Sequence, residues 1–402
     1  MTESFTDRLR RLRREPGSEH AESRLPSSPS QPRELPEWLR ARLGKHGSDA
    51  GSTPCVASSA GAPRELIAFE GARGAACARV TRFALDHRHG EVELRCALRA
   101  RASDLALIGI ERRLAGLSLE RALYLDIETT GLAGGAGTKA FLVGIGRFDA
   151  AGFELWQGFL REPEDEAALL DECARRVAEA GALVSFFGKS FDRHRLEDKM
   201  RVHGIAPPFE RCLHLDLYHP CRRLFGAELS NGRLATMERS IAGVARAHDL
   251  PGAFAPAAWY DYLAGRSHRL EEVFEHNRDD ILSLVVIASA LADLARADDR
   301  AAVPPARALA LARCAERVGD WRACRRWARW ALESGGGESA EVAAGALALA
   351  ARSCEECGEI EALDELCARA RVLGSSELAA RIERRKSRAL RRSRTRAWER
   401  ER

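Results

Sequence analysis

The feature that most constrains the fold is an alternation of strand-like and helix-like stretches between residues 102 and 298. The apolar strand RALYLDIE comes first, followed by AFLVGIGRFD and FELWQGFLRE, which a tight turn at 150–152 would join as a hairpin. Helix-like and strand-like stretches then alternate through PEDEAALLDECARRVAEA, ALVSFFG, SFDRHRLEDKMRVHG (opening at a serine cap) and HLDLYHP, before helices near 234–248 and 270–294. This order predicts an α/β fold with a mixed sheet flanked by helices.

The segments on either side of this region differ from it in composition. Residues 1–62 are rich in Ser, Pro, Gly, Arg and Glu, and we predict disorder because little apolar surface could offset the ordering entropy. Residues 64–98 carry short apolar alternations that predict a strand-rich lead-in. After residue 302 the chain is rich in Ala, Leu and Arg, with two stretches that each read as helix, Gly-acidic turn and helix. They predict an all-α region of two helical hairpins, loosely like tetratricopeptide repeats.

We therefore expect four segments: a disordered segment (1–62), the α/β domain (63–300), a helical-repeat domain (301–380) and a basic tail (381–402). The tail holds eleven Lys and Arg against three Glu, so its charge of +8 exceeds the +4 of the whole chain. It is either a solvated segment or an additional, salt-sensitive contact for phosphates.

Composition also excludes several classes of protein. No apolar run reaches the ~18 residues that a membrane helix needs, and the N-terminus has no apolar leader segment. The eleven cysteines are odd in number and scattered, which is typical of reduced thiols rather than a disulfide framework. These features predict a cytoplasmic protein without a membrane segment.

The strongest chemical signal is a pair of acids at the end of the first strand, in the sequence DIETTGL. Asp126 and Glu128 are two residues apart, so they share one face of a strand whose apolar neighbours indicate burial. Two buried carboxylates repel each other and lose hydration, so they need a cation between them, and Mg²⁺ or Mn²⁺ suits such oxygen ligands. The alternative is an exposed acidic pair with no function.

Further candidate residues follow along the chain. Asp192 is expected in the first turn of a helix, where a simple capping role is the alternative. His276 and Asp280 are four residues apart on a predicted helix and so share a face, although His276 could be an ordinary solvated residue. Asp279 competes with Asp280 for this position, and Asp216 at the end of a strand is either a further ligand or a structural acid.

In this order, DIETTGL, FGKSFD and HNRDDILSL resemble the three motifs of the DEDD (DnaQ-like) exonuclease superfamily, whose fold is ribonuclease-H-like. The stretches HLDLYHPCRRLFG, RLATMERSIAGV, DLPG and WYDYL are similar to the YprB-like group of predicted nucleases, which pair such a domain with C-terminal helical repeats. The resemblance covers residues 64–298 well and the remainder loosely.

The resemblance implies a hydrolase, namely a metal-dependent 3′–5′ exonuclease that acts on single-stranded or structured ends of DNA or RNA. It implies that two Mg²⁺ or Mn²⁺ ions, roughly 3.5–4 Å apart, activate water and stabilise the leaving oxygen. It also implies that His276 accepts the proton of the water. The metal ligands would be Asp126, Glu128, Asp192 and Asp280. The residues lining the terminal nucleotide would be Thr129, Thr130, Gly131 and Leu132.

Two departures from the family pattern motivate a rival hypothesis. Phe187 stands where family members usually have Asn, and His276 lies four residues before the last Asp, a spacing the family usually gives to Tyr. The rival is an inactive nuclease fold that binds nucleic acid or recruits a protein, and the helical repeats could themselves hold a protein partner.

Three other motifs give weaker indications of function. The glycine-rich stretch 131–139 matches neither phosphate-binding pattern and is expected to be a flexible loop beside the acidic residues. Cys354 and Cys357 lack the further ligands that zinc needs. The cluster of Trp321, Trp327 and Trp330 is expected to form core.

Overall fold

The computed structural model describes residues 61–131, 137–246, 254–298, 303–333 and 339–400. Residues 1–60 of the segment predicted to be disordered (1–62) lie outside these described residues. The main sheet has seven strands in the order β1-β2-β7-β6-β5-β8-β9. Their bounds are β1 Ile67–Gly71, β2 Gly74–Phe83, β5 Leu123–Thr129, β6 Ala140–Asp149, β7 Gly152–Phe159, β8 Ala182–Ser185 and β9 Leu213–Asp216.

The sheet is mixed, as the sequence predicted. Strands β1, β2, β7, β6 and β5 pair antiparallel in turn, whereas β8 and β9 run parallel to β5. The predicted hairpin is β6–β7, and Gly152 allows its tight turn because it adopts a φ of 137°. Strand β5 therefore lies in the interior of the sheet, and side chains at its end lie beside the ends of β8 and β9. A separate two-stranded ribbon joins β3 (Arg88–His89) to β4 (Val92–Glu93).

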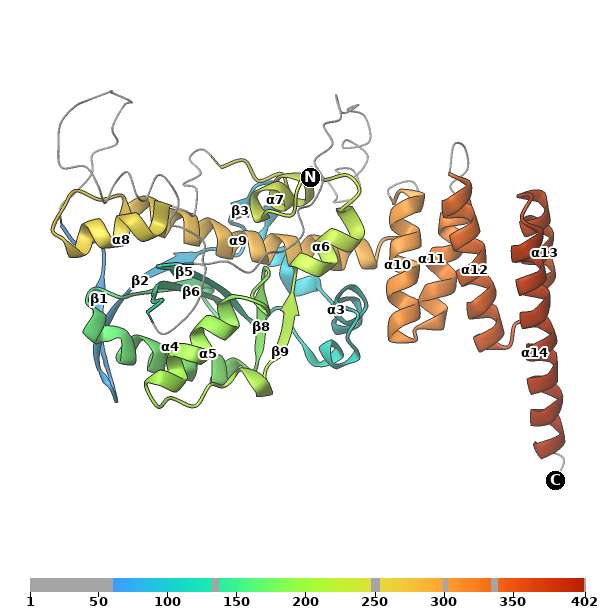
Figure 1. Cartoon of the computed structure of the whole chain (residues 1–402), viewed down its shortest axis with the longest axis horizontal. Coiled ribbons are helices and arrows are strands. Elements are labelled where there is room, and N and C mark those ends of the chain that lie inside the picture. The colour runs from blue at the N-terminus through green and yellow to red at the C-terminus, as the bar shows by residue number, and fades with distance from the viewer. Residues whose placement is uncertain (1–60, 132–136, 247–253, 299–302, 334–338, 401–402) are drawn as a thin grey trace, which may run out of the picture.

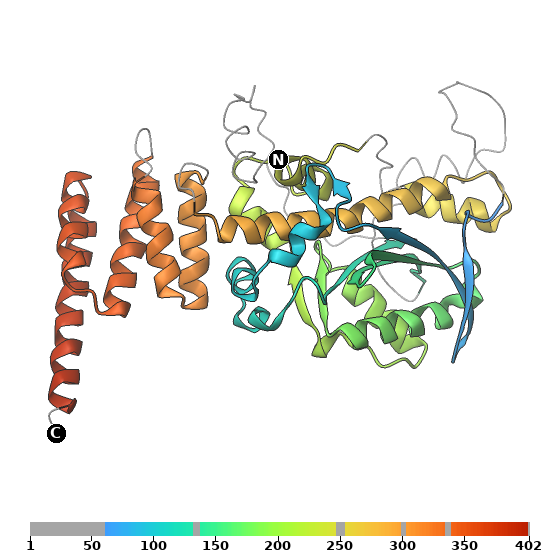
Figure 2. The same cartoon turned by 180° about the vertical axis from the view of Figure 1, so that it is seen from behind.

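Helices cover both faces of the sheet (Figure 1). The long helix α9 crosses one face with α7 and α8, and α4 and α5 lie on the other (Figures 1 and 2). The bounds in this region are η1 Leu94–Arg99, α3 Ala102–Gly109, η2 Arg112–Gly116, η3 Pro163–Asp165, α4 Glu166–Ala180, α5 Asp192–Val202, η4 Phe209–Arg211, α6 Tyr218–Phe225, α7 Leu234–Ala242, α8 Ala255–Leu263 and α9 Leu270–Ala295.

The C-terminal region is all-helical, as predicted, and continues from the end of α9 as a row of helices (Figure 1). Two helical hairpins form around Gly319 and Gly358, which end their helices in the left-handed conformation with φ of 72° and 76°. The helices are α10 Pro305–Val318, α11 Trp321–Glu333, α12 Ala340–Cys357, α13 Ala362–Val372 and α14 Ser376–Arg400. None of the described helices has the length and apolar character that crossing a membrane requires.

The helical region packs directly on the α/β domain. One hydrophobic core runs from Leu107 of α3 and Phe225 of α6 into Leu309 of α10 and onward to α14. Polar contacts reinforce this junction, because the Arg307 guanidinium donates to the Leu224 carbonyl at 3.1 Å and Arg112 donates to Val318 at 2.6 Å. A second core is built from residues of α4, α5, α8 and the first turns of α9, together with β5, β6 and β7.

Local differences from the sequence predictions occur where elements end. Helix α5 begins at Asp192 with Phe191 as its N-cap, so the predicted serine cap is wrong. The stretch HLDLYHP is only partly strand, since β9 ends at Asp216 and α6 begins at Tyr218. Helix α14 spans the expected boundary at 380/381 because its buried residues, among them Ile382 and Ala389, pack on the helices before it.

Candidate active site

The four acids singled out from the sequence lie at one end of the sheet. Asp126 and Glu128 belong to β5, Asp192 begins α5 beyond β8, and Asp280 lies midway along α9, which crosses over β5. Glu128 and Asp192 are buried, while Asp126 and Asp280 are partly exposed. The structure thus brings together side chains that are up to 154 residues apart in the chain (280 − 126).

These carboxylates perturb one another. Burial raises the pKa of Asp126 well above its usual value, and repulsion from Asp280, Asp192 and Glu128 adds to the rise. The pKa of Glu128 is likewise raised by burial and by Asp280 and Asp192. Burial, with Asp216 and Asp280, raises the pKa of Asp192 to about 8. Holding these acids together with fewer basic groups than acids therefore destabilises the folded protein when the acids are charged.

His276 joins the cluster from the same face of α9 as Asp280. Its Nε2 atom lies 3.6 Å from Asp280 Oδ2 and 4.0 Å from Glu128 Oε1. Asp279 has a different environment, since it pairs with the Arg278 guanidinium at 2.9 Å. Helical spacing explains the difference, because residues four apart share a face and adjacent residues do not.

Sequence reasoning missed Arg246, which contacts both Asp280 and His276. Its Nη2 atom donates to Asp280 Oδ1, and its Nη1 atom lies 3.2 Å from His276 Nδ1. Two further bonds, of 2.6 and 2.7 Å, join its guanidinium to the carboxylate of Glu238 on α7. Arg246 is 34 residues from Asp280 in a segment without helix or strand, so no local spacing indicated this pairing.

A buried amide on α9 was also missed. Asn277 Nδ2 donates to Asp126 Oδ2 at 2.8 Å, and Asn277 Oδ1 accepts from Gln157 of β7 at 2.9 Å. Gly144, which pairs with Asp126 in the sheet, makes this possible, because a Cβ atom there would lie 2.3 Å from Asn277 Oδ1. The amide fixes the orientation of Asp126, and the only signal for it was its place beside His276.

Asp216 serves the backbone rather than the cluster. Its carboxylate accepts hydrogen bonds from the backbone N–H groups of Phe187, Lys189 and Tyr218 at 2.8, 3.0 and 3.1 Å. These bonds hold the loop between β8 and α5, in which Phe187 adopts a left-handed φ of 62°. Asn tolerates that conformation better than Phe does, so the departure from the family pattern falls at a strained position. The Phe187 ring is 44% exposed and contacts Tyr218 edge to face.

The residues expected at the terminal nucleotide follow the acids directly. Thr129 Oγ1 donates to the Gly131 carbonyl at 3.1 Å, and Thr130 Oγ1 accepts from the Lys139 backbone at 3.0 Å. Among the described residues, no atom outside its own neighbours lies within 4 Å of where a Cβ of Gly131 would be. Leu132 and most of the expected glycine-rich loop lie outside the described residues.

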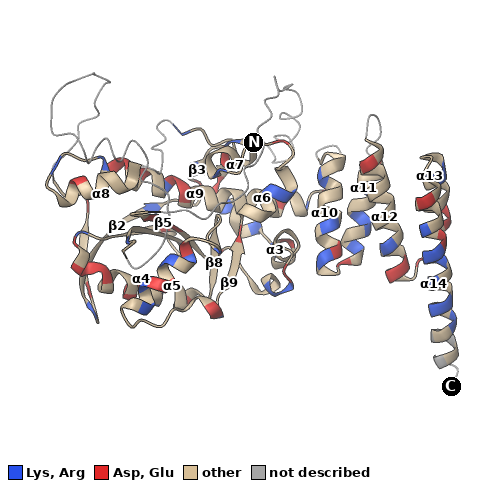
Figure 3. Ribbon diagram, in the orientation of Figure 1, with Lys and Arg blue, Asp and Glu red and all other residues tan. Residues whose placement is uncertain are grey.

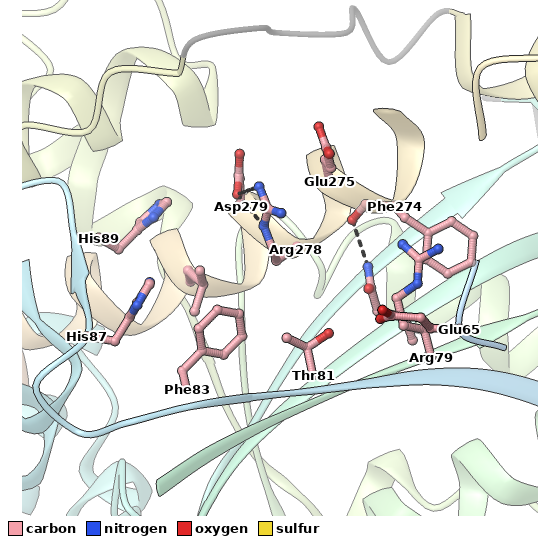
Figure 4. A pocket seen from close by; sticks show the side chains of 12 residues that line it. Glu65, Arg79, Thr81, Phe83, His87, His89, Phe274, Glu275, Arg278 and Asp279 are labelled. Atoms are coloured by element: carbon pink, nitrogen blue, oxygen red, sulfur yellow. Dashed lines mark hydrogen bonds and ion pairs between the residues drawn. The ribbon is translucent and has the colours of Figure 1, made fainter. Parts of the chain in front are cut away.

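A cavity of about 480 Å³ lies on the opposite side of α9 from the acids, between that helix and β2. Figure 4 shows Arg278 and Asp279 projecting toward it from α9, with Arg79 and Thr81 below them. None of the four acids lines it. Its basic and acidic groups largely neutralise each other, as the Arg278–Asp279 pair illustrates.

The acids are suitable ligands for a divalent cation, but they are not arranged as a closed cage. Among the described residues, no group of three or more His, Cys, Asp or Glu side chains converges with ligand geometry. Asn277 and Arg246 each hold one carboxylate oxygen, of Asp126 and Asp280 respectively, and the acids repel one another. The chemistry of the donor set fits Mg²⁺ or Mn²⁺, since these ions prefer carboxylate oxygens and keep several waters.

Other sequence hypotheses concern the remainder of the molecule. The cysteines in the described ranges are free thiols, with Cys354 buried and Cys357 exposed. Trp327 and Trp330 stack at 4.7 Å in the core between the helices, whereas Trp321, the third member of the predicted cluster, is partly buried against that core.

Comparison with known proteins agrees with this architecture. Residues 123–292 match the family described as the RNase_H superfamily, so the α/β domain has the ribonuclease-H-like fold that the motifs implied. The chain is also similar to the uncharacterized protein YprB of Bacillus subtilis (strain 168), with 31% identity over 216 residues. That alignment covers 52% of this chain and 51% of the relative, so the chain spans about half the length of the curated relative it matches. The resemblance to YprB is thus confirmed.

Proposed function

We propose that this protein is a metal-dependent nuclease that hydrolyses phosphodiester bonds, most specifically a 3′–5′ exonuclease of the DEDD type. The observation that supports the proposal is the cluster of Asp126, Glu128, Asp192 and Asp280. The pKa values of the first three are raised by burial, and the charge of Asp280 adds to each rise. A fold gains nothing from gathering four repelling acids, two of them buried, so a cation is expected to neutralise them.

The four acids would hold two Mg²⁺ or Mn²⁺ ions, which supply an activated water and a stabilised leaving oxygen when bound. Asn277 orients Asp126, and Arg246 orients Asp280, so two of the ligands are fixed by hydrogen bonds before substrate arrives. His276 is proposed to accept the proton of the attacking water, since it contacts the cluster from α9.

The substrate is proposed to enter over the end of β5. Thr129, Thr130, Gly131 and Leu132 would line its terminal nucleotide, and the open space at Gly131 supports this placement. Whether the sugar is ribose or deoxyribose depends on contacts to the 2′ position. The direction of cleavage and the exonucleolytic mode rest on the resemblance to the DEDD superfamily.

The proposal is tested with single-stranded DNA and RNA labelled at the 3′ or the 5′ end, incubated with Mn²⁺ or Mg²⁺. Wild-type protein should give metal-dependent products, and Asp126→Asn should not, because the amide cannot supply a second anionic oxygen. Asp279→Asn is the matched control, since Asp279 pairs with Arg278 outside the cluster. Binding of the oligonucleotides without cleavage would contradict the proposal and favour an inactive, nucleic-acid-binding fold.

A further inference from the structure

Arg246 is the cation that the structure itself places among the acids. Its side chain is only 5% exposed, and its guanidinium is bonded on three sides, to Glu238, Asp280 and His276. The fork of a guanidinium suits such simultaneous contacts, which an ammonium group could not reproduce in one plane.

The position of Arg246 is set from outside the cluster. Glu238 is 1% exposed, and it also accepts a hydrogen bond from the Ser283 hydroxyl of α9. Ser283 Oγ in turn lies 2.8 Å from His89 Nε2 of β3. The guanidinium is therefore anchored by α7, α9 and the β3 ribbon, and it does not need the acids of the cluster to stay in place.

This contact has a consequence for His276. A guanidinium can only donate hydrogen bonds, so the Nδ1 atom that meets Arg246 Nη1 at 3.2 Å must accept. A neutral imidazole whose Nδ1 accepts carries its hydrogen on Nε2. Nε2 is the atom that lies 3.6 Å from Asp280 Oδ2, so it faces the carboxylates as a donor.

We infer that Arg246 is a positioning residue that holds His276 in the tautomer with hydrogen on Nε2, because its guanidinium donates to Nδ1. The inference rests on the proposed function for its significance, because a general base needs a free lone pair toward the water. Its physical content, the tautomer, belongs to the protein without substrate.

The tautomer can be read directly from long-range proton–nitrogen correlation spectra of protein labelled with ¹⁵N-histidine. Spectra are recorded without metal at pH 8, above the usual titration range of imidazole, and His276 is assigned from the His276→Gln variant. We expect the wild type to show hydrogen on Nε2 alone. Arg246→Met should lose this preference and move the nitrogen shifts toward a tautomer average. Arg239→Met, an exposed neighbour on α7, is the matched control and should change nothing.

Hydrogen on Nδ1 in the wild type, as the other tautomer or as imidazolium, would overturn the inference, as would an unchanged spectrum in Arg246→Met. If Arg246→Met fails to fold because Glu238 is left uncompensated, Arg246→Met with Glu238→Gln removes both charges and takes the same measurement. The spectra do not depend on hydrolysis. A failed cleavage assay therefore leaves this inference standing, and a wrong tautomer leaves the nuclease proposal standing.

Discussion

Two regions of this molecule place acids in opposite kinds of surroundings. In the helical region, Glu355 of α12 is almost fully buried and both of its oxygens are bonded to arginines of α14, Arg385 and Arg388. These partners lower the pKa of Glu355 despite the opposing effect of burial. At the end of β5, by contrast, burial and mutual repulsion raise the pKa values of Asp126 and Glu128.

The difference separates an acid whose charge is neutralised within the fold from the acids that we propose bind a cation. Figure 3 shows Lys and Arg along much of α14, and in the structure several of these residues close ion pairs with α12 and α13. Part of the positive charge of residues 381–402 is therefore neutralised by ion pairs with neighbouring helices. No such supply of arginines reaches the four acids, where the described partners include a single arginine, Arg246, together with the Asn277 amide and the His276 imidazole.

The largest effect on hydrolysis is expected from removing one negative charge from the cluster of four acids. Asp280→Asn should lower the rate of hydrolysis roughly 1000-fold, which corresponds to the several kcal/mol that a bound metal ion contributes. Asp279→Asn should stay near the wild-type rate. The comparison would break if both variants lost activity equally, as measured with end-labelled oligonucleotides.

A methyl group added at Gly144 should act on the same cluster without changing any charge. A Cβ there would lie 2.3 Å from Asn277 Oδ1, so Gly144→Ala should push the amide away from Asp126. Loss of such a supporting contact costs about 10- to 100-fold in activity or metal affinity. Gly137→Ala is a suitable control because no atom of the part of the chain that the structure describes lies within 4 Å of its Cβ position. An active Gly144→Ala would show that Asn277 is dispensable.

Changing Glu355, the acid that is paired with two arginines, should affect stability instead of hydrolysis. Glu355→Ala leaves Arg385 and Arg388 without their shared partner and should lower the free energy of unfolding by about 1–3 kcal/mol, since Arg388 is partly exposed to solvent. Urea unfolding followed by circular dichroism measures the change. Hydrolysis by the folded variant should be unaffected, and a parallel loss of activity would show that the two regions are not independent.

The smallest effect is a difference in pH dependence. Asp192 has a folded-state pKa of about 8 against 3.8 for the ordinary side chain, so between these values only the native state holds its proton. Its contribution to stability is present at acidic pH and is lost as pH rises toward 8. Asp192→Asn should therefore flatten the decline in melting temperature of metal-free protein between about pH 5 and 8. An unchanged decline would mean that Asp192 is not perturbed.

The features of the site that depend on local spacing could be predicted from the sequence. The two-residue period of a strand placed Asp126 and Glu128 together, and the four-residue spacing of a helix separated Asp280 from Asp279. It did not predict Arg246, Glu238 or Asn277, because their partners are fixed by packing of α7 and α9 rather than by neighbours in the chain.

Fold prediction was limited for the same reason. The order of strands and helices was readable from periodicity, whereas the strand order across the sheet and the docking of α10 on α3 and α6 depend on long-range contacts. The predicted serine cap of α5 was wrong because the Asp216 carboxylate organises that loop from β9, 24 residues after Asp192.

The most direct test of the central claim is calorimetric titration of Mn²⁺ into protein freed of metal. Wild-type protein and Glu355→Gln should bind Mn²⁺ equally, because the matched acid takes no part, whereas the double variant Asp126→Asn with Asp280→Asn should bind none. Binding should also release protons, since the pKa of Asp192, raised to about 8, favours its protonated form at neutral pH without a cation. Absence of Mn²⁺ binding by the wild type, or equal binding by the double variant, would contradict the claim that these unmatched acids form a cation site.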